Sequence, residues 1–242
     1  MGKRIRVQRR GKGSPTFKAS THKRVAPSKY PSPNNLEQPS TILVEDLVHD
    51  PGRGAPLLKG RLEDQIIHIV APEGVSTGQE VFLGQRAPLA IGSILPLQHI
   101  PPGTIICNVE QSPGDGGKIA KASGTYASVV THTSEGILVR LPSKRTKYFH
   151  PQCRATIGVI SGAGRVVKPF VKAGRAHAWK IAKGKMYPTT KGVAMVPAYH
   201  PHGGGAHKSS SLRPTTVSRT TPPGRKVGLI AARQSGRAKR RR

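Results

Sequence analysis

Acidic residues are missing from more than half of this sequence. All 11 Asp and Glu residues lie between Glu37 and Glu135, whereas the 40 Lys and Arg residues continue towards both ends. The formal net charge is +29. Self-repulsion on this scale destabilises a compact fold that has no counter-charge. The pattern therefore favours a chain that lies against a dense polyanion, and nucleic acid has the required charge density. The alternative is a merely soluble, supercharged surface.

Cysteines, aromatic residues and long apolar runs are also scarce. Only two cysteines occur, Cys107 and Cys153, and no CxxC pair, which excludes a disulfide framework and a zinc knuckle. Cys107 lies in an apolar run and is expected to be a small buried hydrophobic residue, in keeping with a reducing compartment. No run approaches the length of a membrane span, and the N-terminus lacks the apolar core of a secretory signal.

Both ends of the chain read as extended arms. Residues 1–36 mix Lys, Arg, Gly, Ser and Pro without apolar periodicity, so they predict an arm that is disordered alone and orders on a partner. Residues 176–242 lose periodicity in the same way and predict a second arm. Glycine lets such a backbone approach phosphates closely, and proline stiffens an extended path.

Short apolar runs separated by Gly and Pro fill the middle of the chain. The expected strands are 41–48, 55–62, 65–70, 80–83, 89–95, 104–109, 126–132, 136–141, 147–150 and 155–160. This spacing predicts a mainly β fold of two small barrels, at 37–100 and 101–175. Five strands favour an oligonucleotide-binding type for the first barrel, and a sandwich is the alternative. Helical turns are expected only at 118–123 and near 177–182.

A glycine-rich stretch at residues 112–121 resembles a phosphate cradle, but it fits neither the P-loop nor the GxGxxG pattern. What remains is a turn with exposed backbone N–H groups, followed by Lys118 and Lys121. Such groups suit an RNA backbone, and the alternative is an ordinary turn with solvated lysines.

Three histidines, His200, His202 and His207, flank the glycines Gly203–Gly205. No metal site is predicted, because metal ligands need rigid support and neighbouring carboxylates, and no acid follows Glu135. General-base catalysis by His200 lacks an orienting carboxylate, and surrounding positive charge favours the neutral ring. Stacking or hydrogen bonding of the rings on RNA is the favoured interpretation.

Trp179 and Tyr187 are interleaved with Lys and Arg over residues 175–187. That arrangement is typical of base stacking combined with phosphate contact, and a small hydrophobic cluster is the alternative. The first barrel holds most of the acids and is expected to face solvent or a basic protein neighbour. The later strands of the second barrel share the positive region, so the folded part is expected to have an RNA face of its own.

Several stretches together closely resemble the large-subunit ribosomal protein L2 family. They are residues 114–127, 153–158 and 192–205, while residues 49–56 and 224–233 resemble its archaeal and eukaryotic branch. The resemblance runs in order over nearly the whole chain. It implies an oligonucleotide-binding-type barrel, then an SH3-like barrel, with N- and C-terminal extensions that penetrate ribosomal RNA.

The resemblance also implies a function, structural and not enzymatic. The implied role is that of a primary rRNA-binding protein that supports subunit association, tRNA binding and the peptidyl-transferase region. The implied partners are large-subunit rRNA, neighbouring ribosomal proteins, the small subunit at the interface and, indirectly, tRNA. The chain would be a monomer within the cytoplasmic ribosome, without a membrane partner. It would have no cofactor of its own, and Mg²⁺ or other ions could be shared with the rRNA.

His200 corresponds to the first histidine of the family's His-Pro-Gly-rich stretch, which leaves direct participation of His200 in acyl transfer as an alternative. Tyr199 stands where the family commonly has an acidic residue, so a carboxylate–imidazole pair is not available there. A duplex-DNA architectural protein is a third alternative that the basic arms alone permit.

The candidate RNA-binding residues come from the basic and histidine–glycine stretches. They are Lys3, Arg4, Arg9, Arg10, Lys118, Lys121, Arg154, Arg175, Lys180, Lys183, Lys185, His200, His202, Gly203, Gly204, Gly205, Arg225, Lys226, Arg233 and Arg237.

Overall fold

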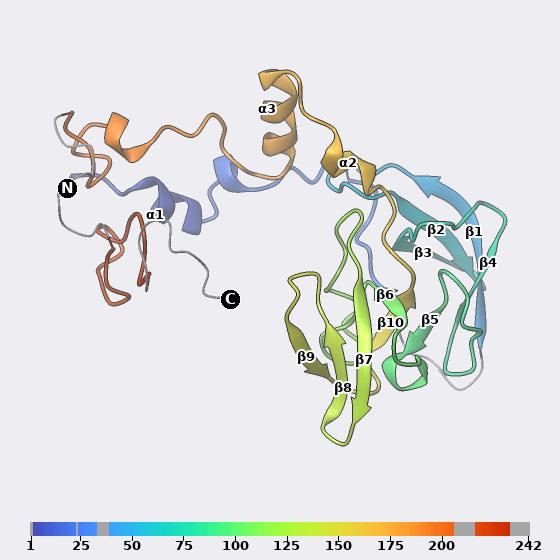
Figure 1. The fold of residues 1–242 in the computed structure, drawn as a ribbon. Helices are drawn as coiled ribbons and strands as arrows, with labels where there is room; N and C mark the ends of the chain where they lie inside the picture. The colour runs from blue at the N-terminus through green and yellow to red at the C-terminus, as the bar shows by residue number, and fades with distance from the viewer. Residues whose placement is uncertain (1, 23, 33–38, 206–215, 233–242) are drawn as a thin grey trace. The chain divides into compact units, whose positions relative to one another are not determined.

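The computed structural model describes residues 2–22, 24–32, 39–205 and 216–232 of the chain. The chain divides into two compact units (Figure 1). One unit, Thr21–Phe170, carries the β-structure and is called the strand unit below. The other, Met1–Ser20 together with Val171–Arg242, is called the basic unit.

Ten strands of the strand unit join in a single mixed sheet. The strands are β1 Ser40–Val48, β2 Leu57–Leu62, β3 Gln65–Val70, β4 Glu80–Leu83, β5 Ile94–Pro96, β6 Ile105–Cys107, β7 Ala127–Thr133, β8 Gly136–Arg140, β9 Thr146–Phe149 and β10 Arg154–Ile157. Their order is β3-β2-β1-β4-β5-β10-β6-β7-β8-β9. All ten predicted strands are confirmed, although β5 begins at Ile94, later than the expected residue 89.

Three apolar clusters form the core, and the two larger ones belong to the two halves of the sheet. One is built mainly from β1 to β4 and includes Ile42 and Val81. The other is built mainly from β6 to β10 and includes Val139. Strand β5 serves both, because Ile94 belongs to the first cluster and its neighbour Leu95 to the second. Successive side chains of a strand point to opposite faces, so this three-residue strand joins the two halves.

The cysteines behave as buried hydrophobic residues. Cys107 and Cys153 are free thiols with no exposed surface. Burial raises the pKa of Cys107 to about 12, so its thiol stays protonated and is a poor nucleophile. The expectation of a small buried hydrophobic residue at Cys107 is confirmed.

Helices are few and short. They are α1 Arg6–Gly11, α2 Gly164–Val167 and α3 Ala173–Ala182, with single 3₁₀ turns at Pro15–Phe17, Leu97–His99 and Gly192–Ala194. The helix expected near 177–182 is confirmed by α3. The helical turn expected at 118–123 is wrong, because Ile119 pairs with Val109 in a β-bridge and Ala120 has a positive φ of 53°.

A buried ion pair links β10 to Glu110, three residues beyond β6. Arg154 Nη2 lies 2.8 Å and Nε 3.1 Å from Glu110 Oε1. The two residues are 1% and 0% exposed. Charges this far from water are stable only when their other donors and acceptors are also bonded.

Glu110 meets that condition through backbone N–H groups. Its Oε2 accepts hydrogen bonds from Arg154 N at 2.8 Å and Gly114 N at 3.3 Å, and its Oε1 accepts one from Gly116 N at 3.0 Å. The carboxylate therefore fixes both β10 and the glycine-rich loop.

Tyr30 closes the opposite side of the arginine. The Arg154 guanidinium carbon lies 5.3 Å from the Tyr30 ring centroid, and Nη1 donates to the carbonyl of Pro31 at 2.8 Å. The Tyr30 hydroxyl donates to the carbonyl of Asn108 at 2.7 Å and lies 2.6 Å from Thr156 Oγ1. Burial raises the pKa of Tyr30, so the hydroxyl stays protonated and able to donate.

The predicted N-terminal arm is not one disordered piece. Lys29 N donates to the carbonyl of His68 and Tyr30 N to the carbonyl of Gly116, at 3.2 and 3.1 Å. Ser28 and Tyr30 are both buried. Residues 28–30 are therefore packed into the strand unit, while the first 20 residues belong to the basic unit.

Replacing Glu110 by Gln is expected to destabilise the strand unit strongly. The variant leaves the Arg154 charge buried without its partner, which costs about 3–5 kcal/mol of unfolding free energy. Urea denaturation followed by circular dichroism measures the loss. Glu45→Gln is the matched control, because Glu45 pairs with Lys59 and Arg61 at the surface and such pairs contribute little. Equal losses in the two variants would contradict the assignment of Glu110 as the central buried charge.

Candidate nucleic-acid interface

Two N-terminal cations of the basic unit lie beside one tyrosine ring. Lys3 Nζ donates to Tyr199 Oη at 3.0 Å and lies 5.0 Å from the ring centroid, while the Arg9 guanidinium lies 5.6 Å from it. The hydrogen bond from Lys3, together with the Lys3 and Arg9 charges, lowers the pKa of Tyr199. Lys3 and Arg9 remain exposed, so both can contact a phosphate as well as the ring.

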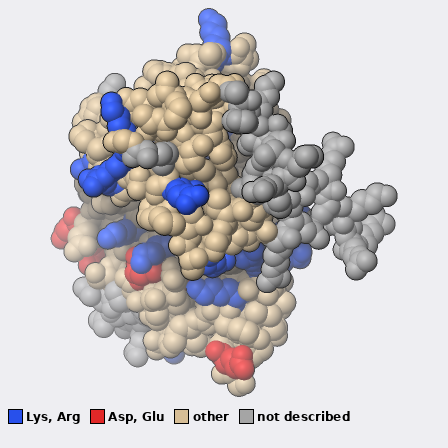
Figure 2. Space-filling model, turned by 90° about the vertical axis from the view of Figure 1, so that its left-hand side faces the viewer, with Lys and Arg blue, Asp and Glu red and all other residues tan. Residues whose placement is uncertain are grey.

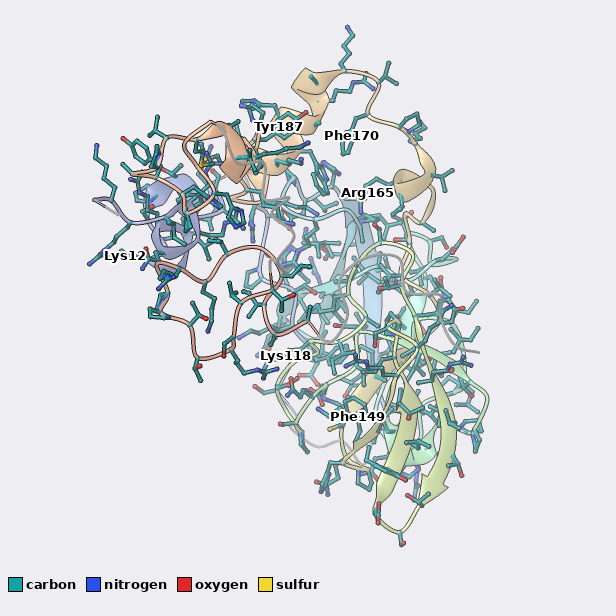
Figure 3. The ribbon with its side chains drawn as sticks, turned by 60° about the vertical axis from the view of Figure 1, so that its left-hand side comes forward. Lys12, Lys118, Phe149, Arg165, Phe170 and Tyr187 are labelled. Carbon is teal, nitrogen blue, oxygen red and sulfur yellow. The ribbon has the colours of Figure 1, made fainter. Side chains whose placement is uncertain are left out.

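Helix α3 has no buried residue, although its side chains are well organised. Lys180 Nζ lies 4.1 Å from the Tyr187 ring centroid, and Lys183 Nζ lies 4.1 Å from the Trp179 ring centroid. A helix of this length gains most of its stability from packing one face against something else. The absence of a buried face therefore leaves α3 available to a partner outside the protein. Figure 3 labels Tyr187 beside this segment.

The histidine–glycine stretch folds tightly around His200. The backbone N–H of His202 donates to His200 Nδ1 at 3.0 Å, so the ring proton sits on Nε2. A side chain at Gly192 would collide with the imidazole, and one at Gly203 with the carbonyls of Met195 and Val196. These glycines are needed for close packing within the protein.

The electrostatic setting of His200 disfavours a charged ring. Partial burial, the neighbouring His202 and the Arg6 guanidinium all lower the pKa of His200. Its Nδ1 is already occupied by backbone, and residues 136–242 contain no acid that could orient it. The lowered pKa agrees with the expectation that surrounding positive charge favours the neutral imidazole, and the arrangement lacks the parts of a general base.

The glycine-rich loop uses its N–H groups internally. Those of Gly114 and Gly116 point to Glu110, and that of Gly117 donates to Asp115 Oδ1 at 3.1 Å. Gly117 also has a φ of +85° and lies so close to Asn108 that any Cβ would collide with it. The prediction of exposed N–H groups for a phosphate is therefore wrong: the protein's own carboxylates fill the cradle.

The two lysines that follow the loop have different environments. Lys118 is exposed, with Nζ 3.3 Å from Asp115 Oδ2 (Figure 3). Lys121 is half-buried and donates to the carbonyls of Ser28 and Gly117 at 2.7 and 2.9 Å. Lys118 can reach a phosphate, whereas Lys121 ties the N-terminal segment to the loop.

Arg154 is too deeply buried to contact RNA, with only 1% of its surface exposed. Its guanidinium is bonded to Glu110 and to the carbonyl of Pro31 and is covered by Tyr30. We therefore leave Arg154 out of the interface, although the sequence placed it there.

Most of the other predicted residues reach the surface. Those exposed are Lys3, Arg4, Arg9, Arg10, Lys118, Arg175, Lys185, Gly204, Gly205 and Arg225, and those half-buried are Lys121, Lys180, Lys183, His200, His202, Gly203 and Lys226. Arg233 and Arg237 lie outside the described residues. On the face drawn in Figure 2, Lys and Arg side chains outnumber Asp and Glu side chains.

Sequence reasoning missed several residues of this surface. Arg6, Lys12 and Phe17 line a groove in the basic unit with Arg4 and Arg9. The six Arg and Lys residues among residues 3–12 were a usable signal. Phe17 was harder to recognise, because the groove that it lines is completed by residues 186–199, which are distant in sequence.

Comparison with known proteins identifies the family. A sequence profile described as "Ribosomal Proteins L2, C-terminal domain" matches residues 90–221. The large ribosomal subunit protein uL2 of Korarchaeum cryptofilum is 49% identical over 100% of this chain and 98% of its own length. The chain belongs to the ribosomal protein L2 family. The uL2 proteins of Methanobrevibacter smithii and Desulfurococcus amylolyticus are 48% and 50% identical, over 98% and 99% of this chain and 99% and 100% of theirs.

The family resemblance drawn from residues 114–127, 153–158 and 192–205 is thus confirmed, with archaeal relatives. The L2 profile spans the Glu110–Arg154 pair and the His200 loop. Among the described residues no group of three His, Cys, Asp or Glu side chains could hold a metal ion. None of the described helices is long and apolar enough to cross a membrane.

The pKa of Lys121 predicts a specific dependence of stability on pH. Burial, followed by the Arg53 charge, lowers this pKa to about 8, against about 10.4 in an unfolded chain. Between these values the unfolded state binds more protons, so this residue makes the unfolding free energy rise with pH. In denaturation from about pH 7.5 to 10, the unfolding free energy of the wild type should therefore rise relative to that of Lys121→Met. Exposed Lys118→Met is the control and should follow the wild type; parallel curves for all three proteins would refute the low pKa.

The His200 ring is expected to titrate below the usual value of 6.5. Arg6→Gln removes a positive charge near the imidazole, so the pKa of His200 should rise towards its usual value. An NMR titration of the ring protons measures this shift. Arg219→Gln removes the same charge elsewhere in the sequence and should leave the titration unchanged. A wild-type pKa at or above the usual value would be inconsistent with this arrangement.

Proposed function

We propose that this chain is a structural component of the large ribosomal subunit and that its basic unit is the main surface for rRNA. The observation that carries the proposal is a unit with no acidic residue in residues 1–20 or 171–242. Several of its cations lie beside aromatic rings, and its longest described helix buries no side chain. Cations with stacking surfaces are the usual means of holding RNA.

The strand unit supplies a second, smaller RNA face in this proposal. Arg140, Lys144, Arg145 and Lys147 are exposed along β8, β9 and the turn between them. A hollow of about 490 Å³ beside them is lined by Tyr126, Arg140 and Lys144, among others. Basic side chains around an exposed aromatic ring fit phosphate and base contacts.

The acids of the first half fit a different neighbour. Glu63, Asp64, Glu73 and Glu80 are exposed around β3 and β4. RNA phosphates would be repelled there, so this face is assigned to solvent or to a basic ribosomal protein.

The finer assignments follow from the family. The β1–β4 and β6–β10 halves, each with its own apolar cluster, correspond to an oligonucleotide-binding-type barrel and an SH3-like barrel. The basic unit provides the extensions that enter rRNA. The chain thereby supports subunit association, tRNA binding and the peptidyl-transferase region within the ribosome. His200 acts in packing and RNA contact and not in acyl transfer.

Binding to large-subunit rRNA fragments is expected to depend steeply on salt. A protein that neutralises 6–10 phosphates loses about 10³–10⁵-fold in affinity between 50 and 200 mM salt. Filter binding or fluorescence anisotropy over that range measures the slope. The triple variant Arg175→Gln/Lys180→Gln/Lys185→Gln should give a shallower slope, because it removes three cations of the basic unit.

Lys59→Gln/Arg61→Gln is the matched control. These two cations are already paired with Glu45, so removing them should leave the salt dependence of rRNA binding unchanged. A shallow slope for the wild type would refute the proposal. Equal affinity for structured rRNA and random duplex DNA at the same salt would favour a DNA-binding protein instead.

A further inference from the structure

A groove lies between the N-terminal segment and residues 186–199 of the basic unit. Its volume is about 550 Å³, within the range of about 300–1,000 Å³ of sites that hold small organic ligands. α1 and the residues beside it line it together with the turn Pro15–Phe17 and the chain around Tyr199. Arg9, one of the two cations beside the Tyr199 ring, therefore also borders the groove.

The groove has a charged part and an apolar part. Arg4, Arg6, Arg9 and Lys12 bring positive charge, and Phe17 brings an aromatic ring. The other apolar lining residues are Met186, Met195 and Val196. No Asp or Glu occurs in residues 1–20 or 171–242, so no carboxylate of the basic unit can balance these cations.

A ligand that fits this groove must therefore be small and must combine negative charge with a flat apolar group. We propose that the groove binds a single unpaired nucleotide of an RNA, with its base against Phe17 and its phosphates against the surrounding Arg and Lys side chains. The inference rests on the proposed RNA-binding function and assigns a specific site within it. The Asp and Glu side chains of an acidic peptide would match the charge, but they carry no flat ring for Phe17. A paired base cannot enter, because its partner strand holds it in the helix.

Arg6 independently indicates that an acceptor is missing. Its Nη1 is buried and has no hydrogen-bond partner among the described residues. A guanidinium donor without an acceptor costs free energy. Because Arg6 lines the groove, a rotation of the guanidinium turns its donors towards a phosphate there. Arginine suits this role, since its planar fork matches phosphate oxygens in a bidentate contact.

The polar groups of the groove do not select a particular base. Ser14, Thr16 and Thr190 line it, and each hydroxyl can both donate and accept a hydrogen bond. Stacking on an aromatic ring is likewise tolerant of base identity. The groove is therefore a site for any unpaired nucleotide that the RNA shape presents.

The experiment compares two RNA hairpins that differ only in whether one nucleotide is bulged or paired. The full-length protein should bind the bulged hairpin about tenfold more tightly, the size expected for one base stacked on a ring. Phe17→Leu should lose this advantage and keep its affinity for the paired hairpin, which also shows that the variant is folded. Val7→Ala, on the same segment but exposed and outside the groove, should keep the advantage.

Four outcomes would overturn the proposal. If the wild type binds both hairpins equally and with a steep salt dependence, the groove assignment fails while RNA binding stands. If it binds neither hairpin, the proposed function fails as well. An advantage that survives in Phe17→Leu, or displacement of the bulged hairpin by poly-glutamate as effectively as by RNA, would also refute it. Should Phe17→Leu bind neither hairpin, Phe17→Tyr keeps the ring and must retain the tenfold advantage.

Discussion

The strand unit depends on one carboxylate that never meets solvent. Glu110 accepts hydrogen bonds from a guanidinium and from three backbone N–H groups, so its charge is satisfied without water. Its partner Arg154 begins β10, which lies between β5 and β6 at the middle of the sheet. The same arginine supports the Tyr30 ring. One ion pair thus links the glycine-rich loop, β10 and the segment around Tyr30. Removing either charge would leave the other buried without a partner in a low dielectric.

The two units manage positive charge in opposite ways. In the strand unit, cations such as Arg154, Arg53 and Lys59 have carboxylate partners. The basic unit has no carboxylate in its sequence, and its cations lie against aromatic rings instead. Its described part buries only Ile5 and Val227, too little apolar surface to offset the entropy of ordering so long a chain. An external polyanion would supply the missing counter-charge and much of the missing packing.

The sheet could be predicted from the sequence because its signals are local. Short apolar runs bounded by Gly and Pro specify strands, and all ten appeared. The loop at 112–117 could not, because the direction of its N–H groups depends on Glu110 and Asp115, whose roles emerge only in three dimensions. Arg154 looks like any other cation in a positive stretch; its burial follows from Glu110, 44 residues away. The composition of the two flanks was enough to predict a basic surface for RNA. The groove around Phe17 could not be predicted, because it forms only when segments distant in sequence come together.

The anchoring of Tyr30 sets an order on the growing chain. Tyr30 is synthesised early, but one of its hydrogen-bond partners, Thr156, lies 126 residues later. Chains are made from the N-terminus at about 5–20 residues per second, so Tyr30 must wait at least several seconds before Thr156 has been synthesised. Contacts this distant in sequence also form late, because the long loop between them must close first. Tyr30 is therefore made early and is among the last residues of the strand unit to be fixed in place.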